Sequence, residues 1–186
     1  MGPEVKELEE TLAAFTGAKY CISCANGTDA LQVALMALGV GQGDEVITPG
    51  FSYIATAETS AVLGAKPVYV DIDPVTYALD PNLLEAAITP RTKAIIPVHL
   101  YGSMADIDKL KAITDKHNLF MIEDCAHMQG GKWNGRGVGS WGDVGSFSFQ
   151  QSKTLSAGEG GICITNDDKL ADLIYRVKHI GYGRNV

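Results

Sequence analysis

Residues 93–123, KAIIPVHLYGSMADIDKLKAITDKHNLFMIE, contain the pattern that decides the fold. The stretch opens with a short apolar run, residues 93–97, and ends with a second one that begins at Phe120. Between the two runs, residues 106–117 follow a helical pattern. Short apolar runs are typical of buried strands, and two of them joined by a helix predict a strand-helix-strand unit. The stretch therefore indicates an α/β architecture.

The same alternation extends over the rest of the chain. The other strand-like runs are residues 20–24, 45–48, 68–71, 144–149 and 162–165, and the other helix-like patterns are residues 5–15, 30–38, 54–63, 81–88 and 169–179. Such alternation predicts an α/β domain with a largely parallel sheet. A chain of 186 residues, 46% of them hydrophobic, is long enough for one domain with a substantial core. In such sheets ligands bind beyond the carboxyl ends of the strands, so polar residues that directly follow a strand-like run are candidates for a site.

The charge balance argues for small-molecule chemistry. Twenty-two acidic and 15 basic residues give a net charge of -7, which disfavours nucleic acid and anionic membranes as partners. The first ten residues are charged and lack the apolar core of a signal peptide. No run approaches the roughly eighteen uninterrupted apolar residues that a membrane span requires. We therefore expect a cytoplasmic protein without a membrane or nucleic-acid partner.

The four cysteines lie in apolar, strand-like surroundings, as expected of reduced core residues. They are Cys21, Cys24, Cys125 and Cys163. The segment Cys21-Ile-Ser-Cys24 has the C-x-x-C spacing of redox and zinc sites, but the chain has no second pair of this kind. We therefore predict no metal site.

A candidate anion site follows the first strand-like run. The segment Asn26-Gly27-Thr28-Asp29 opens a helix, so its backbone N–H groups and the Thr28 hydroxyl would face an anion at the positive end of the helix dipole. The same residue types are favoured in ordinary helix caps, so a phosphate site and a simple cap remain equally open. The dinucleotide motif G-x-G-x-x-G and the P-loop lysine are both absent from this segment.

A pair of carboxylates, Glu123 and Asp124, ends the strand-like run that begins at Phe120. A carboxylate buried there needs a cationic partner or good hydrogen bonds, and His127 is a candidate partner. The alternative is that Asp124 merely caps the next turn.

Lys153 lies among small, polar and glycine residues in a connection between two apolar strands. A lysine near a buried site can act as a nucleophile toward a carbonyl group, as an imine-forming cofactor requires. From this segment alone, a lysine on a surface loop is the alternative.

Five ordered motifs resemble the DegT/DnrJ/EryC1/StrS aminotransferase family, and the similarity covers nearly the whole chain. The motifs are residues 26–31, 48–56, 123–127, 142–149 and 152–161. Members of this family are homodimers that use pyridoxal 5'-phosphate (PLP) to aminate keto-sugars or cyclitols. The resemblance implies the three-layer α/β fold of PLP-dependent transferases of fold type I, with a mostly parallel sheet. It further implies that residues 1–186 form the PLP-binding large domain, without the C-terminal small domain and the initial segment of the family.

Two residues receive catalytic roles from the resemblance. Lys153 is implied to form the Schiff base with PLP, and Asp124 to pair with the pyridinium nitrogen. A protonated ring nitrogen lets the cofactor act as an electron sink.

The remaining implied roles are contacts to the cofactor. Gly27, Thr28 and Ser148 would hold the phosphate group, and Tyr53 would stack on the ring. His127 would lie near the 3-hydroxyl group.

The predicted activity is transfer of an amino group from glutamate or glutamine to a ketone. The acceptor would be a keto-sugar, namely a nucleotide-linked 3- or 4-keto-hexose, or a cyclitol ketone. Sugar dehydratases of the same family carry histidine in place of the Schiff-base lysine, so Lys153 argues against that alternative. A cofactor-binding fragment without turnover is a further alternative, and a Rossmann-type oxidoreductase lacks its glycine motif. The acceptor stays open: residues 21–32 are similar to enzymes of UDP-linked 3-keto-uronates, and residues 149–155 to inosose enzymes.

Overall fold

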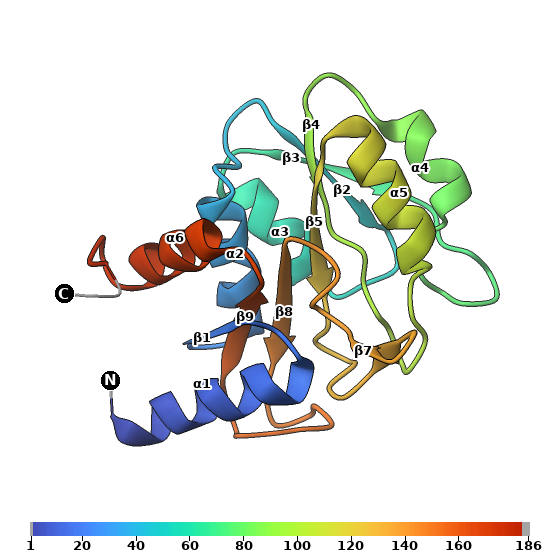
Figure 1. Ribbon diagram of the computed structural model, residues 1–186. Coiled ribbons are helices and arrows are strands. Elements are labelled where there is room, and N and C mark those ends of the chain that lie inside the picture. The colour runs from blue at the N-terminus through green and yellow to red at the C-terminus, as the bar shows by residue number, and fades with distance from the viewer. Residues whose placement is uncertain (1, 184–186) are drawn as a thin grey trace.

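The computed structural model describes residues 2–183, and its centre is a twisted sheet of seven strands (Figure 1). The strands of this sheet are β1 (Tyr20–Cys24), β2 (Glu45–Pro49), β3 (Lys66–Val70), β4 (Thr92–Ile95), β5 (Phe120–Asp124), β8 (Val144–Ser148) and β9 (Gly161–Thr165). The order across the sheet is β1-β9-β8-β5-β4-β2-β3. Within this sheet β9 pairs antiparallel with both β1 and β8, and the other pairs are parallel. The predicted α/β domain with a largely parallel sheet is confirmed.

Six helices connect or flank these strands. They are α1 (Pro3–Thr16), α2 (Gly27–Ala37), α3 (Ala55–Val62), α4 (Pro81–Ala87), α5 (Ile107–His117) and α6 (Asp168–Lys178). Each lies within about three residues of a helix that the sequence predicts. The sequence patterns missed a small hairpin of β6 (Lys132–Trp133) and β7 (Arg136–Gly137), because strands of two residues carry no periodic pattern.

Helices pack on both faces of the sheet, which gives three layers (Figure 1). Ala94 and Ile122 belong to the core beneath α2 and α6, whereas the adjacent residues Ile95 and Met121 belong to the core beneath α4 and α5. This division follows from the pleat of a strand, in which successive side chains point to opposite faces. Strands buried on both faces need continuous apolar runs, which is the pattern that the sequence shows.

The cysteines behave as core residues. Cys21, Cys125 and Cys163 are buried, Cys24 is half-buried, and all four are free thiols. Burial raises the pKa of Cys21 to about 12 and that of Cys24 to about 11. Because the thiolate is the reactive and metal-binding form, these values argue against a redox or zinc role for the C-x-x-C segment.

Across residues 2–183, none of the helices combines the length and the apolar character needed to cross a bilayer.

Candidate active site

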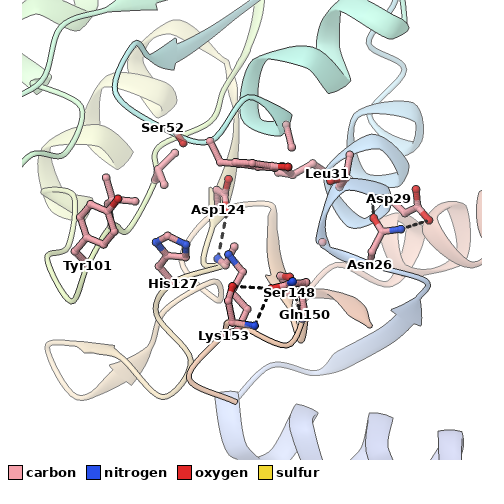
Figure 2. Close-up of a pocket in the computed structure, with 18 of the residues that line it drawn as sticks. Asn26, Asp29, Leu31, Ser52, Tyr101, Asp124, His127, Ser148, Gln150 and Lys153 are labelled. Atoms are coloured by element: carbon pink, nitrogen blue, oxygen red, sulfur yellow. Dashed lines mark hydrogen bonds between the residues drawn. The ribbon is translucent and has the colours of Figure 1, made fainter. Parts of the chain in front are cut away.

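A cavity of about 1020 Å³ opens at the carboxyl edge of the sheet (Figure 2). All seven residues for which the sequence predicts a role line this cavity. They are Gly27, Thr28, Tyr53, Asp124, His127, Ser148 and Lys153. They end or directly follow four strands at this edge, which are β1, β2, β5 and β8. In Figure 2, Tyr101 lies at one end of the cavity and Asn26 at the other, with Asp124, His127 and Lys153 between them.

The amino end of α2 forms one end of the cavity. The side chain of Asn26 caps this helix by accepting a hydrogen bond from the Asp29 N–H at 2.8 Å. Gly27 lies so close to β8 that an added Cβ would be 2.6 Å from the Cβ of Ser148. Glycine is therefore required where the helix meets the end of β8. The segment is both a helix cap and one wall of the cavity, so the two interpretations of its sequence are compatible.

Asp124 ends β5 and is 5% exposed. Its Oδ2 accepts a hydrogen bond from the Thr56 hydroxyl at 3.0 Å, and its Oδ1 accepts one from the Ala126 N–H at 3.1 Å. Burial raises the pKa of this carboxyl group, and the two hydrogen bonds oppose the rise without cancelling it. Asp124 thus caps the following turn and lines the cavity at the same time.

The backbone of Asp124 is fixed from the neighbouring segment after β4. Its N–H donates to the Pro97 carbonyl oxygen at 2.9 Å, and its own carbonyl oxygen accepts from the His99 N–H at 3.0 Å. A carboxylate on a rigid strand end is well suited to orient a ligand group, because little conformational freedom is left to lose.

Glu123, the residue before Asp124, is fully buried and points to the other face of the sheet. Its Oε1 accepts from the N–H groups of Trp141 and Gly142 at 2.8 and 2.7 Å, and its Oε2 accepts from the Gly139 N–H at 2.8 Å. Oε2 also lies 3.0 Å from Nε2 of His99. Burial alone would raise the pKa of Glu123, but the hydrogen bonds from His99 and the backbone hold it below its ordinary value.

The proton on His99 can be assigned from its partners. Nδ1 accepts the Ala105 N–H at 3.2 Å, so the proton of the neutral ring is on Nε2, where it is donated to Glu123. His99, Glu123 and Cys125 carry potential metal ligands within 4.8 Å of one another. Both ring nitrogens and both carboxylate oxygens are already engaged, so the cluster gives no support for a metal.

His127 lines the cavity and is partly buried. Partial burial and the charge of Lys153 lower its pKa, so the neutral ring is favoured. The ring packs against Tyr101, with centroids 5.4 Å apart. The hydrogen bonds to the Asp124 carboxylate come from Thr56 and Ala126 rather than from His127. Sequence reasoning proposed His127 as the partner of the carboxylate and missed Thr56, which lies 68 residues away.

Lys153 is half-buried on the connection between β8 and β9, and its side chain lines the cavity. Its N–H donates to the Gln150 carbonyl oxygen at 2.8 Å, and the Gln150 side chain accepts from the N–H and hydroxyl of Ser152. The connection is therefore organised by its own hydrogen bonds. It is a surface loop, as the alternative interpretation of the sequence holds, and it still directs Lys153 to the cavity.

Other residues line the cavity without having been predicted. Ser52, Tyr101, Gln150 and Glu159 are four of them. Tyr101 has a left-handed backbone with φ of 52° and is followed by Gly102, also at positive φ. The glycine at position 102, in the connection between β4 and α5, is the sequence signal that would have found this turn.

Comparison with known proteins agrees with these features. The model of the DegT/DnrJ/EryC1/StrS aminotransferase family matches residues 1–186. The chain is 62% identical over 185 residues to the UDP-2-acetamido-2-deoxy-3-oxo-D-glucuronate aminotransferase of Pseudomonas aeruginosa, which covers 99% of this chain and 52% of that protein. It is 53% identical over 168 residues to an L-glutamine:2-deoxy-scyllo-inosose aminotransferase of Streptoalloteichus tenebrarius, covering 90% of this chain and 39% of that protein.

A solved structure agrees as well. NtdA from Bacillus subtilis, solved with the bound cofactor PMP, matches with a TM-score of 0.94 and 36% identity, over 100% of this chain and 42% of that one. The chain thus spans about half, or less, of the length of the proteins that it matches. With the family model matched from the first residue to the last, the chain belongs to the DegT/DnrJ/EryC1/StrS aminotransferase family.

Proposed function

We propose that the protein is a PLP-dependent aminotransferase that moves an amino group from glutamate or glutamine to a keto-sugar. The observation that carries the proposal is a single cavity at the carboxyl edge, lined by a lysine, a buried carboxylate and a helix amino end. These are the three groups that PLP needs for its carbonyl carbon, its ring nitrogen and its phosphate.

The described residues fit this cofactor. A carboxylate accepts about four hydrogen bonds, and Asp124 receives two from the protein, so acceptor capacity remains for a ring N–H. The phosphate would be held at the amino end of α2 by Gly27 and Thr28, together with Ser148, which packs against Gly27. When bound, PLP supplies an electron sink that stabilises negative charge at the substrate carbon.

Each catalytic side chain has one task in this proposal. The Asp124 carboxylate would keep the ring nitrogen protonated, and its burial strengthens this interaction because the site is poorly solvated. The amine of Lys153 would bind the cofactor covalently. The free Nζ of Lys153 would also be the general acid and base that accepts and returns the substrate proton.

Two aromatic residues would orient the cofactor ring. Tyr53 would stack on the ring, and His127 would lie near the 3-hydroxyl group. The packing of His127 against Tyr101 supports this role, because it restricts the imidazole ring.

For the acceptor, we favour a UDP-linked 3-keto-uronate over an inosose. Identity to the enzyme named for the uronate substrate is 62% over 185 residues, against 53% over 168 residues for the enzyme named for the inosose. A cyclitol ketone is the second candidate, supported by that second relative.

We further infer that the protein acts as a homodimer in the cytoplasm. Tyr53, Ile54 and Tyr69 are 58–71% exposed and lie together around a smaller hollow beside the cavity. Apolar surface grouped in this way is typical of an interface, and a second copy of the chain would cover it. The four free cysteines suit a reducing compartment.

An assay of the intact protein with PLP tests the function. Glutamate and glutamine are each paired with the UDP-linked 3-keto-uronate and with the inosose, and the aminated product is measured. We expect transfer to the uronate to be the fastest. Binding of PLP without transfer to any acceptor would instead support a protein that binds the cofactor without turnover. Loss of a hydroxyl group from the acceptor in place of its amination would indicate a dehydratase.

A further inference from the structure

Two hydroxyl groups connect Asp124 to the wall of the cavity. Thr56 is 1% exposed, and its Oγ1 lies 3.0 Å from Oδ2 of Asp124. Ser52 lies 2.8 Å from Thr56, Oγ to Oγ1, and it lines the cavity near Asp124 (Figure 2). None of the roles proposed above uses either hydroxyl.

The direction of these hydrogen bonds follows from the number of protons. An ionised carboxylate can only accept, so the single hydroxyl proton of Thr56 is donated to Asp124. The Thr56 oxygen must then accept the proton of Ser52. Both O–H dipoles therefore point toward the carboxylate, an arrangement in which each hydrogen bond strengthens the other.

The same short segment carries the residue proposed to stack on the cofactor. The N–H of Thr56 donates to the Tyr53 carbonyl oxygen at 3.1 Å, in the turn that leads into α3. The Thr56–Asp124 hydrogen bond consequently ties this turn to the end of β5, two elements that are separated by 68 residues in the sequence.

The surroundings of Asp124 make such a donor necessary. The titratable groups that act on this carboxylate or share its cavity include His99, His127 and Lys153. His99 is hydrogen-bonded to Glu123 and to the Ala105 N–H, and the lowered pKa of His127 favours its neutral ring. Among the described residues, Thr56 is the side chain that donates a hydrogen bond to Asp124.

We propose that Thr56, supported by Ser52, is the positioning residue that keeps the Asp124 carboxylate ionised and oriented toward the cavity. The consequence for catalysis rests on the proposed function, in which Asp124 pairs with the cofactor. The contact itself exists without a ligand, so it can be tested on the protein alone.

The experiment follows the carboxyl carbon of Asp124 by NMR in the cofactor-free intact protein, as a function of pH. The signal is identified as the one missing from Asp124→Asn. Thr56→Val removes the hydroxyl and keeps the shape of the side chain, whereas Thr56→Ser keeps the hydroxyl and is the matched control. Because one hydrogen bond to an ionised group is lost, we expect the titration midpoint of Thr56→Val to rise by about one pH unit. The titration midpoint of Thr56→Ser should stay within about 0.3 pH units of the wild-type value, because serine keeps the donated hydrogen bond.

Ser52→Ala provides a second test that does not disturb the buried threonine. Its midpoint should rise by less than that of Thr56→Val, because Thr56 still donates but is no longer polarised. Unchanged midpoints in both Thr56→Val and Ser52→Ala would overturn the proposal. If Thr56→Val does not fold, an unchanged midpoint in Ser52→Ala overturns it alone.

The proposed function can fail separately. If the wild-type protein does not bind PLP, the function is wrong, and the titration of the cofactor-free protein still decides the role of Thr56. If PLP binds, the pH dependence of its absorbance should shift in the order Thr56→Val, Ser52→Ala, Thr56→Ser, from largest to smallest. This optical readout needs no turnover.

Discussion

Glu123 and Asp124 are adjacent carboxylates at the end of one strand, and their surroundings differ completely. Glu123 is fully buried and receives four hydrogen bonds, two on each oxygen. Asp124 is nearly as buried, receives two, and borders the cavity. The pKa of Glu123 is lowered and that of Asp124 is raised, although burial acts in the same direction on both.

The difference shows how a buried charge is used. The bonds of Glu123 join the segment of residues 139–142 and His99 to β5, so this carboxylate stabilises the layer behind the site. Asp124 keeps unused acceptor capacity where a ligand can reach it. Its pKa is raised because burial disfavours the charged form and its two hydrogen bonds offset this only in part. We therefore interpret Asp124 as the functional carboxylate of the pair and Glu123 as the structural one.

The largest expected effect is on catalysis. Asp124→Asn should keep much of the affinity for PLP and lose about 100- to 1000-fold in the rate of amino transfer, because a neutral amide does not hold the ring nitrogen protonated. Single-turnover kinetics with glutamate and the keto-sugar measure this loss. Near-normal turnover would mean that Asp124 is a turn cap and no more.

The corresponding substitution of the neighbouring residue, Glu123→Gln, should affect the free energy of unfolding instead of catalysis. Glu123→Gln is expected to lower the free energy of unfolding by about 3 kcal/mol, because the amide presents N–H groups to donors that need an acceptor. Urea unfolding at neutral pH compares it with Asp124→Asn, which should be as stable as the wild type or slightly more so. Equal losses in the two variants would break the distinction between the two carboxylates.

His99→Gln, which changes a partner of Glu123, should destabilise the protein less than Glu123→Gln does. It removes one of the four donors to Glu123 and leaves the three backbone N–H groups in place. We expect a loss of about 1–2 kcal/mol in the free energy of unfolding. Affinity for PLP, measured by optical titration, should change by less than about threefold, which is below 1 kcal/mol. A large drop in affinity without a loss of stability would place His99 in the cofactor site instead.

The smallest effects, and the sharpest contrast, lie in the pH dependence of stability. A lowered carboxyl pKa contributes stability that is present above the unfolded value, about 4.3 for glutamate, and is lost as the pH falls through the folded value. A raised carboxyl pKa has the opposite sign: stability is lost as the pH rises from the unfolded value, about 3.9 for aspartate, toward the folded one. Relative to the wild type, Glu123→Gln should therefore lose stability as the pH rises from 3 to 7, and Asp124→Asn should gain it. Parallel pH trends in urea unfolding would contradict the assigned directions.

The sequence predicts the fold well because each element carries its own local signal. Strands buried on both faces appear as short apolar runs, and the helices between them have their own spacing, as in residues 93–123. Lys153 and Asp124 were found through motifs. The partners of the two carboxylates were not, because Thr56 is 68 residues from Asp124 and His99 is 24 residues from Glu123. No local sequence pattern indicates these two contacts, because they form only when the strands assemble into the sheet.

The proposed site is tested most directly by finding which lysine binds the cofactor. The protein is incubated with PLP and reduced with borohydride, and the modified peptide is mapped by mass spectrometry. We expect the label on Lys153, because it is the lysine that lines the cavity together with Asp124 and the amino end of α2. A label on any other lysine, with Lys153 unmodified, would contradict the assignment of this cavity as the site of amino transfer.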